Sequence, residues 1–315
     1  MSKEYAVVFM EGGLGKIVAA TAAIRCLKKA YPDKKIVTVS GYPEVFDRNP
    51  HVYRTFRFNE NKYLFEEYVK QGTIFERDPY HLDSYRFDEV SLVQAYCDAW
   101  GVEFDGSIVP ELYLDAALDT ITAKQMSDLR QQAKLPVLVV QYMGRSFKDQ
   151  QSNVFLPSGR ENIPLYEKVM QELCEKFVLV LMKLPDEPGV TVPKNVVTQK
   201  DPVHFVRWFG YIKNADGFLG VDSCGHHIAA AFRKPAVVCW GRTSHKNLGY
   251  RFHTNILGEC EERPCNGFMK VPAPGWKCSH DFKCMKSITP EKVTSAVLNM
   301  FKQSTAQEEK ENATT

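Results

Sequence analysis

The stretch GFLGVDSCGHHIAAAFRKPAVVCWGR, residues 217–242, carries the pattern that decides the fold. Residues 218–221 form a short apolar run, and residues 227–232 read as the start of an alanine-rich helix. Residues 236–240 then resume a buried strand. A strand, a polar turn, a helix and a second strand in this order predict a ligand-binding turn in an α/β protein.

The polar turn at Asp222 and Ser223 falls where the strand gives way to the helix. A helix N-terminus presents unpaired N–H groups and the positive end of the helix dipole, which suit a phosphate. Asp and Ser are also the preferred N-cap residues, so an ordinary helix cap explains the same letters. The turn alone leaves both interpretations open.

Length and composition indicate a soluble globular protein of two domains. The chain has 315 residues, of which 44% are apolar and 25% charged. No apolar run approaches the roughly 20 residues of a membrane helix, and the N-terminal residues lack a signal-peptide pattern. A cytoplasmic location, in a bacterial or phage-infected bacterial cytosol, is therefore expected. A net charge of +2 is too small to predict nucleic-acid binding by itself.

The order of expected elements predicts two doubly wound halves. Residues 5–10 read as a strand, 11–15 as a glycine-rich turn, 17–30 as a helix and 35–40 as a strand. A second series begins near residue 134, with strands expected at 135–141 and 177–182 and a helix at 165–175. The expected domains are 1–133 and 134–302, the second closed by a helix over 289–301, and residues 303–315 form a polar tail expected to be disordered. Two such domains predict a ligand cleft between facing switch points.

Three blocks make the chain resemble glycosyltransferase family 9, the ADP-heptose:lipopolysaccharide heptosyltransferase group. The first block is GGLGKIVAATAAIRCLKKAYPD at 12–33, and the second is Asp222-Ser-x-x-x-His227. The third contains Cys260, Cys265, Cys278 and Cys284 and is followed by ITPEKV at 288–293. The resemblance implies a GT-B fold of two facing Rossmann-like domains, with the nucleotide-sugar donor bound by the C-terminal domain and the acceptor by the N-terminal domain.

The resemblance implies inverting transfer of a sugar from an ADP-heptose-like donor to an acceptor hydroxyl. The leaving nucleoside diphosphate gains negative charge, which a helix N-terminus stabilises. Asp222 is then expected to hold hydroxyls of the donor sugar. The residues expected to donate hydrogen bonds to the diphosphate are Ser223, Gly225, His226 and His227, and the acceptor-side loop contains Gly12, Gly13 and Gly15.

Further donor contacts are expected after the strand at 135–141. Arg145, Lys148 and Arg160 lie where the family places a basic residue against the diphosphate, and a solvated basic loop is the alternative for each. Arg160 matches the family element best, although Ile163 replaces its tryptophan. Glu187 is a candidate partner for a ribose hydroxyl.

The chain departs from the family at Lys16, because heptosyltransferases carry their base aspartate after the glycine turn. A lysine ammonium is a poor proton acceptor at neutral pH unless burial depresses its pKa, so Lys16 is expected to anchor a phosphate or the acceptor. Glu11 is the nearest replacement carboxylate, with an ordinary strand-end surface residue as the alternative. His226 and His227 are further candidates for the base.

Other motifs exclude some classes of site. Met10 and Ile17 break the P-loop pattern, and the chain has no Asp-x-Asp, so a metal-bridged diphosphate is not expected. The four C-terminal cysteines could bind structural zinc, but their spacing is loose and reduced thiols are preferred. The expectation is therefore no cofactor beyond the nucleotide-sugar substrate.

Rival functions remain open from sequence. The acceptor could be a lipopolysaccharide core sugar, a capsule or small-molecule hydroxyl, or a hydroxylated base in viral DNA. A different class is a noncatalytic nucleotide-sugar binding protein that kept the fold and lost the base, for which Lys16 is the main support.

Overall fold

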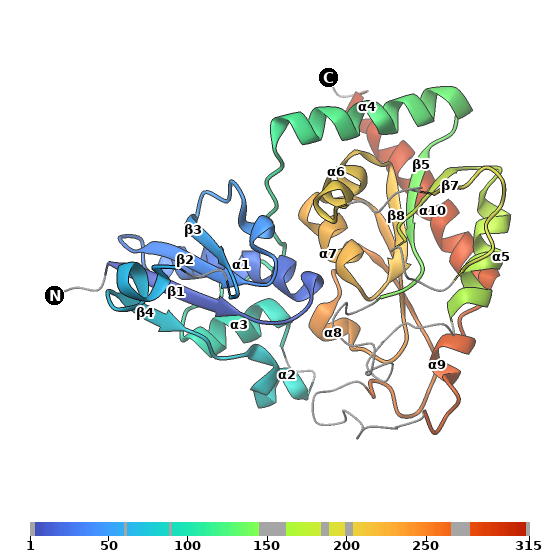
Figure 1. Ribbon diagram of the computed structural model, residues 1–315. Coiled ribbons are helices and arrows are strands. Elements are labelled where there is room, and N and C mark those ends of the chain that lie inside the picture. The colour runs from blue at the N-terminus through green and yellow to red at the C-terminus, as the bar shows by residue number, and fades with distance from the viewer. Residues whose placement is uncertain are drawn as a thin grey trace. The chain divides into compact units, whose positions relative to one another are not determined.

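The computed structural model describes residues 4–59, 62–87, 90–144, 162–183, 189–198, 204–265 and 278–312, and beyond residue 303 only the backbone of the last helix. The chain divides into two compact units, shown in Figure 1. The first unit comprises Met1–Ala116 with Lys246–Leu248, and the second comprises Ala117–His245 with Gly249–Thr315.

The first unit is built on a four-stranded parallel sheet in the order β3-β2-β1-β4. Ala6, Val7 and Val8 are fully buried, as expected for a parallel strand covered on both faces. The elements are β1 (Tyr5–Met10), α1 (Leu14–Ala30), β2 (Lys35–Ser40), η1 (Pro43–Phe46), β3 (Val52–Arg57), η2 (Phe65–Val69), β4 (Gly72–Phe75), η3 (Pro79–His81), α2 (Asp83–Arg86) and α3 (Leu92–Trp100).

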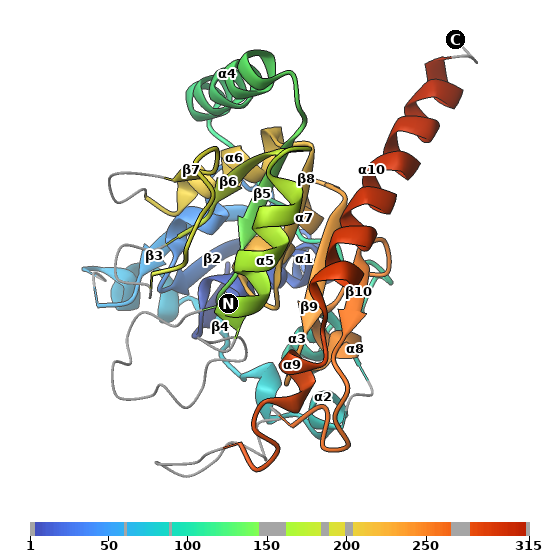
Figure 2. The same cartoon turned by 90° about the vertical axis from the view of Figure 1, so that its right-hand side faces the viewer.

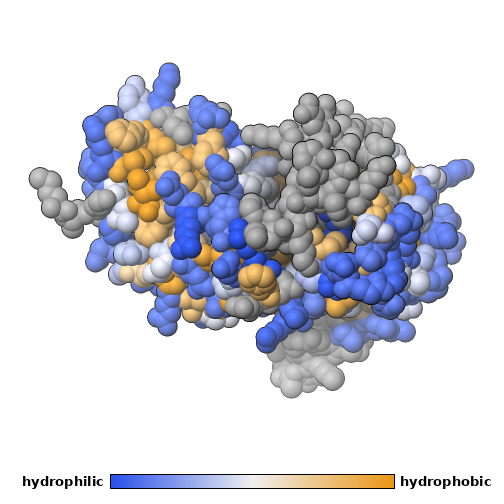
Figure 3. Space-filling view, turned by 90° about the horizontal axis from the view of Figure 1, so that it is seen from below, coloured by the Kyte–Doolittle hydropathy of each residue, from blue (hydrophilic) through white to orange (hydrophobic). Residues whose placement is uncertain are grey.

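One face of this sheet packs against the short η2 through aromatic side chains. Val7 and Val37 form a small core with Tyr68, and Tyr5 meets the Tyr68 ring edge-on at 5.0 Å between centroids. Such a thin cover leaves large apolar side chains in solvent, including Phe65 of η2 and Ile74 of β4. Figure 3 shows apolar surface on the first unit, at the left of the view.

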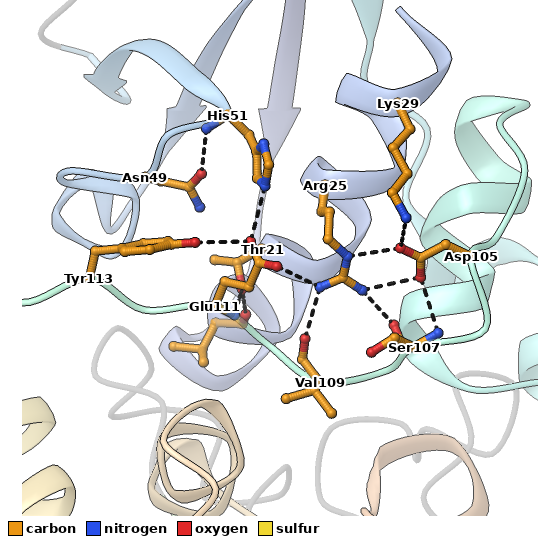
Figure 4. Close-up of polar contacts among 11 residues, drawn as sticks. Thr21, Arg25, Lys29, Asn49, His51, Asp105, Ser107, Val109, Glu111 and Tyr113 are labelled. Atoms are coloured by element: carbon orange, nitrogen blue, oxygen red, sulfur yellow. Dashed lines mark hydrogen bonds and ion pairs between the residues drawn. The ribbon is translucent and has the colours of Figure 1, made fainter. Parts of the chain in front are cut away.

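A polar network built around Arg25 holds α1 to the segment that follows α3 (Figure 4). The Arg25 guanidinium binds both carboxylate oxygens of Asp105, at 2.9 and 3.2 Å, and Oε1 of Glu111 at 2.8 Å. Burial disfavours its charge, but these two carboxylates outweigh burial and raise the pKa of Arg25. The second oxygen of Glu111 lies 3.3 Å from Nε2 of His51, and the Glu111 N–H donates to Oγ1 of Thr21.

The second unit contains a six-stranded parallel sheet in the order β10-β9-β8-β5-β6-β7. Helices α5 and α10 pack together on one face of this sheet, and α6 and α7 cover the other (Figures 1 and 2). The elements are α4 (Ala116–Ala133), β5 (Val137–Gln141), α5 (Ile163–Leu173), β6 (Val178–Leu181), β7 (Val197–Thr198), α6 (Val206–Asn214), β8 (Gly217–Val221), α7 (Cys224–Ala231), β9 (Ala236–Trp240), α8 (His245–Leu248), β10 (Thr254–Leu257), α9 (Lys283–Lys286) and α10 (Pro290–Asn312).

The division between the units falls at the first residue of α4, Ala116, whereas the sequence places the domain boundary after residue 133. Arg130 of α4 pairs with Asp216 at 2.8 Å, and Thr122 lies so close to Gly210 that an added Cβ would sit 2.3 Å from its hydroxyl oxygen. Polar pairing and one close contact hold this helix to the second unit. A sequence pattern that relies on apolar periodicity does not detect such attachment.

The chain end also differs from the sequence expectation. Thr289 caps α10 as expected, because its Oγ1 accepts the N–H of Lys292 at 3.3 Å. The helix then continues through Asn312, although residues 303–315 were expected to be disordered. In the described parts of the chain, none of the helices is both long and apolar enough to cross a bilayer.

Candidate functional site

The strand order places a topological switch point in the second unit between β5 and β8. From β5 the chain adds β6 and β7 on one side, and then returns to place β8 on the other. Ligands of open α/β sheets bind at the carboxyl ends of strands at such a point. Gln141 is the last residue of β5, and Asp222 directly follows β8.

Gln141 connects the two strand ends through its side-chain amide. Its Nε2 donates to Oγ of Ser223 at 3.0 Å, and its Oε1 accepts the N–H of Gly225 at 3.0 Å. An added Cβ at Gly225 would lie 2.4 Å from that Oε1, so the position requires glycine. The N–H of Gly225 was expected to bind phosphate, but it is already bonded within the protein.

Ser223, and not Asp222, caps α7. The Ser223 side chain accepts from the N–H of His226, and the Ser223 N–H donates to Nδ1 of His226 at 3.2 Å, which completes a capping box. Ser223 remains half-buried, whereas Gly225, His226 and His227 are buried. Of the four expected diphosphate contacts, Ser223 at the helix start is therefore the one placed to meet a ligand.

Asp222 is a buried carboxylate at the sheet edge, with 8% of its surface exposed. Burial raises the pKa of this carboxyl, and the neighbouring charge of His226 opposes the shift. Because Ser223 is the N-cap of α7, Asp222 does not cap this helix. A carboxylate in this position can accept hydrogen bonds from hydroxyl groups.

The two histidines of α7 are part of an aromatic interior. Their rings lie 3.8 Å apart between centroids, and Nδ1 of His227 is 2.7 Å from the hydroxyl of Tyr250. Burial, followed by the charges of His226 and His253, lowers the pKa of His227 well below its ordinary value. Neither ring has the exposure that the proton-accepting base of a transfer reaction needs.

Metal binding by Asp222, His226 and His227 is disfavoured by the state of one ring, although their ligand atoms lie within 4.8 Å of one another. Because Nδ1 of His226 accepts the Ser223 N–H, the proton of the neutral ring lies on Nε2. Nε2 of His226 is therefore a hydrogen-bond donor. A metal ion needs a lone pair on the ligating nitrogen, so this Nε2 is not available as a ligand.

The first unit has its own switch point, between β1 and β4. Glu11, Gly12, Gly13 and Gly15 follow β1, and Asp78 lies three residues beyond the end of β4. Gly12 has φ +120°, and an added Cβ would approach Cδ of Lys16 to 2.7 Å. The glycine turn therefore gives the Lys16 side chain room to fold back over it.

Lys16 is buried in an ion pair and is not a free anchor for a phosphate. Only 7% of its surface is exposed, and Nζ lies 2.6 Å from Oδ2 of Asp78 and 4.1 Å from the centroid of the Tyr80 ring. Burial lowers the pKa of Lys16, while Asp78 and Glu11 act to raise it. Glu11 itself is exposed at the strand end.

Asp78 was not among the site residues expected from the sequence. The signal that could have found it is a polar Asp-Pro pair just after a short strand, the position that ligand-binding residues of parallel sheets occupy. The aromatic and charged residues before it obscured that strand. Four other expected site residues, Arg145, Lys148, Arg160 and Glu187, lie outside the described residues, so their roles stay predictions.

The four C-terminal cysteines lie near one another in the second unit. Burial, followed by the charges of Cys265, Cys260 and Cys278, raises the pKa of Cys284 to about 11. Burial is also the main cause that raises the pKa of Cys265; the neighbouring Arg242 opposes this shift, and Cys278 and Cys260 add to it. The N–H of Phe282 donates to Sγ of Cys278 at 3.3 Å. The four cysteines fall within 25 residues of sequence, but in the described part of the chain the ligand atoms that lie within 4.8 Å of one another here belong to Cys260, Glu261 and His280.

Comparison with solved structures places this geometry in a known fold. The family 9 glycosyltransferase of Veillonella parvula superposes with a TM-score of 0.65 over 96% of this chain and 99% of that chain, at 13% identity. This is a two-domain glycosyltransferase fold. The dodecameric, iron-containing glycosyltransferase TibC of enterotoxigenic E. coli superposes with a TM-score of 0.68 over 96% of this chain and 77% of that chain, at 13% identity. ADP-heptose lipopolysaccharide heptosyltransferase II of E. coli superposes with a TM-score of 0.64 over 95% of this chain and 99% of that chain, also at 13% identity.

These comparisons confirm the expected α/β fold of the GT-B type. They also confirm that the structure resembles those of family 9 glycosyltransferases. No protein-family model matches the sequence, and no curated protein matches it either. At this level of identity the likeness concerns the fold, and the chemistry has to be argued from the sites.

Proposed function

We propose that this protein is a glycosyltransferase that moves a sugar from an ADP-heptose-like donor to an acceptor hydroxyl with inversion. The observation that carries the proposal is the second-unit switch point, where the buried Asp222 and the half-buried Ser223 lie at the start of α7. Structures with the same fold include TibC in complex with ADP-D-β-D-heptose and heptosyltransferase WaaC with ADP, at TM-scores of 0.63 and 0.55.

The proposed roles follow from chemistry. The positive end of the α7 dipole and the Ser223 hydroxyl stabilise the charge that develops on the leaving diphosphate. Asp222 accepts hydrogen bonds from hydroxyls of the donor sugar, which a carboxylate does with about twice the strength of a neutral acceptor. The acceptor binds the first unit. The expected interdomain cleft stays a prediction.

Thermal shifts with ADP and ADP-heptose test the donor class. A ligand at about 100 times its Kd stabilises the folded state by roughly 2.7 kcal/mol, so both compounds should raise the melting temperature. Asp222→Asn keeps the side-chain volume and should keep the ADP shift, but it should lose the additional shift that ADP-heptose produces. A loss of about 10- to 100-fold in ADP-heptose affinity is expected for a charged hydrogen-bond acceptor.

Asp128→Asn is the matched control, because Asp128 is partly exposed on α4 and pairs only with Lys124 within the described contacts. Its shifts should equal those of the wild type. Absence of any shift with nucleoside diphosphates or nucleotide sugars would contradict the proposal. A shift without turnover on any acceptor would favour the noncatalytic binding protein.

We also propose that Cys260, Cys265, Cys278 and Cys284 close around a structural metal ion when it binds, in place of the free thiols preferred from sequence. Burial and the neighbouring sulfurs disfavour the thiolate forms of Cys265 and Cys284, and a bound cation reverses both effects. The N–H donated to Cys278 is the type of contact that supports a metal-bound sulfur. That TibC contains iron adds support from a protein of the same fold.

Elemental analysis of the purified protein should find about one zinc or iron ion per chain. Cys265→Ser and Cys284→Ser should lower that content severalfold, and a chelator should lower the melting temperature of the wild type but not of these variants. Cys174→Ser is the control, since this buried thiol caps the C-terminal end of α5 and bonds to the Gln171 carbonyl. Metal-free wild-type protein with an unchanged melting temperature would refute the site.

A further inference from the structure

One ion pair of the first unit, between Lys16 and Asp78, lies at the switch point of its sheet. β2 and β3 lie on one side of β1 in the strand order, and β4 pairs with β1 on the other side, so the switch point of this sheet lies between β1 and β4. Lys16 comes from the helix after β1, and Asp78 comes from the segment after β4. Their side chains therefore meet at the sheet edge where ligands of this architecture bind.

Asp78 is held in a fixed orientation. Its Oδ2 accepts from Nζ of Lys16 at 2.6 Å, and its Oδ1 accepts the backbone N–H of Tyr80 at 2.8 Å. A carboxylate offers about four lone-pair positions, so two bonds leave capacity for another proton donor. The side chain is 29% exposed, which gives a hydroxyl group access to it.

Lys16 is the positioning residue of this pair. Its side chain is almost fully buried, with the ammonium over the Tyr80 ring, so its charge acts mainly on the carboxylates beside it. Glu11, by contrast, is exposed at the end of β1 and lacks such a fixed arrangement among the described contacts. Geometry therefore favours Asp78 over Glu11 as the group that takes a proton.

We propose that Asp78, oriented by Lys16, is the general base that deprotonates the acceptor hydroxyl. The inference rests on the proposed glycosyl transfer. The hydroxyl proton moves to a carboxylate oxygen of Asp78, and the hydroxyl oxygen forms a bond to the anomeric carbon of the donor. The bond from that carbon to the diphosphate breaks, and its electron pair leaves with ADP. Asp78 then releases the proton to water.

Release of ADP from ADP-heptose, with water or a lipopolysaccharide core as acceptor, measures the step. A positioned base contributes about 100- to 10,000-fold, so Asp78→Asn should lower the rate by at least about 100-fold. The ADP thermal shift should stay at the wild-type value. If Asp78 takes the proton, the wild-type rate should fall toward acid pH, and the residual activity of Asp78→Asn should lack that fall.

The double variant Lys16→Met with Asp78→Asn separates a base from a structural partner. It removes both charges, so no buried ammonium is left unpaired. If Asp78 is the base, the double variant stays as slow as Asp78→Asn. Recovery of the wild-type rate would show that Asp78 only neutralises Lys16, and would overturn the inference.

Two more variants complete the test. Asp83→Asn changes an exposed aspartate on α2, five residues away, and should keep the wild-type rate. Glu11→Gln addresses the competing carboxylate, and a large loss there with a normal rate in Asp78→Asn would overturn the inference. Wild-type protein that neither binds ADP nor releases it would overturn the proposed function itself, a result distinct from failure of Asp78 alone.

Discussion

Arg25→Met is expected to destabilise the first unit by up to about 3 kcal/mol, the lower end of the range for removing one partner from a buried ion pair, because this pair is partly exposed. The side chain is 13% exposed and binds Asp105 and Glu111 together with the carbonyl oxygens of Ser107 and Val109. Its removal leaves two carboxylates with fewer partners in a poorly solvated site. Hydrogen exchange of α1 peptides and urea unfolding measure the loss.

Arg48→Met is the matched control for this prediction. It makes the same chemical change in the same unit, but Arg48 is 58% exposed and pairs with the exposed Asp115. Surface pairs contribute roughly 0–1 kcal/mol, so its effect should be small. Arg25→Lys should fall between the two, because lysine retains the charge but not the planar fork of donors. Equal losses in Arg25→Met and Arg48→Met would contradict the role of the network.

Acidification is expected to destabilise the second unit between pH 6.5 and about 4. Burial, and secondarily the charge of His226, lowers the pKa of His253 to about 3, and that of His227 also lies well below its ordinary value. In this range the unfolded chain binds protons that the folded state excludes, so stability rises with pH and falls toward acid. Each histidine contributes up to about 1.4 kcal/mol per pH unit.

Asp222 has the opposite sign, because its raised pKa lets the folded state bind a proton before the unfolded state does. One carboxyl does not offset two histidines over this range. Urea unfolding at several pH values should show the slope, and His253→Gln should reduce it by about 1.4 kcal/mol per pH unit. His81→Gln, at an exposed position of the first unit, should leave the slope of the second unit unchanged. An unchanged slope in His253→Gln would contradict this assignment.

Much of the fold was accessible from sequence. The strands expected at residues 5–10 and 35–40 coincide with β1 and β2, and that at 236–240 coincides with β9. Parallel strands are buried on both faces, so each appears as a continuous apolar run that local sequence reveals. The segment between β2 and α3 was less accessible, because its aromatic residues belong to a thinly covered sheet face and have weak periodicity.

The local structure around the candidate site was predicted in part, and the differences in bonding share one cause. The turn at Asp222 and Ser223 was located correctly, but the N–H of Gly225 and the ring of His226 turned out to be bonded within the protein. Their partners are supplied by a strand 84 residues away and by the capping box itself. A residue type in a motif indicates which bonds a side chain can form, and the folded structure determines which of them are already made.

The sequence by itself determined that this protein has two α/β units and a helix-start turn in the second, because those features follow from apolar runs and helix signals that are local. Only the tertiary structure decided that Lys16 meets Asp78, 62 residues along the chain, and that Gln141 meets Ser223. Both contacts exist because β4 returns beside β1 and β8 returns beside β5. Strand order depends on the packing of the whole sheet, and no local pattern specifies it.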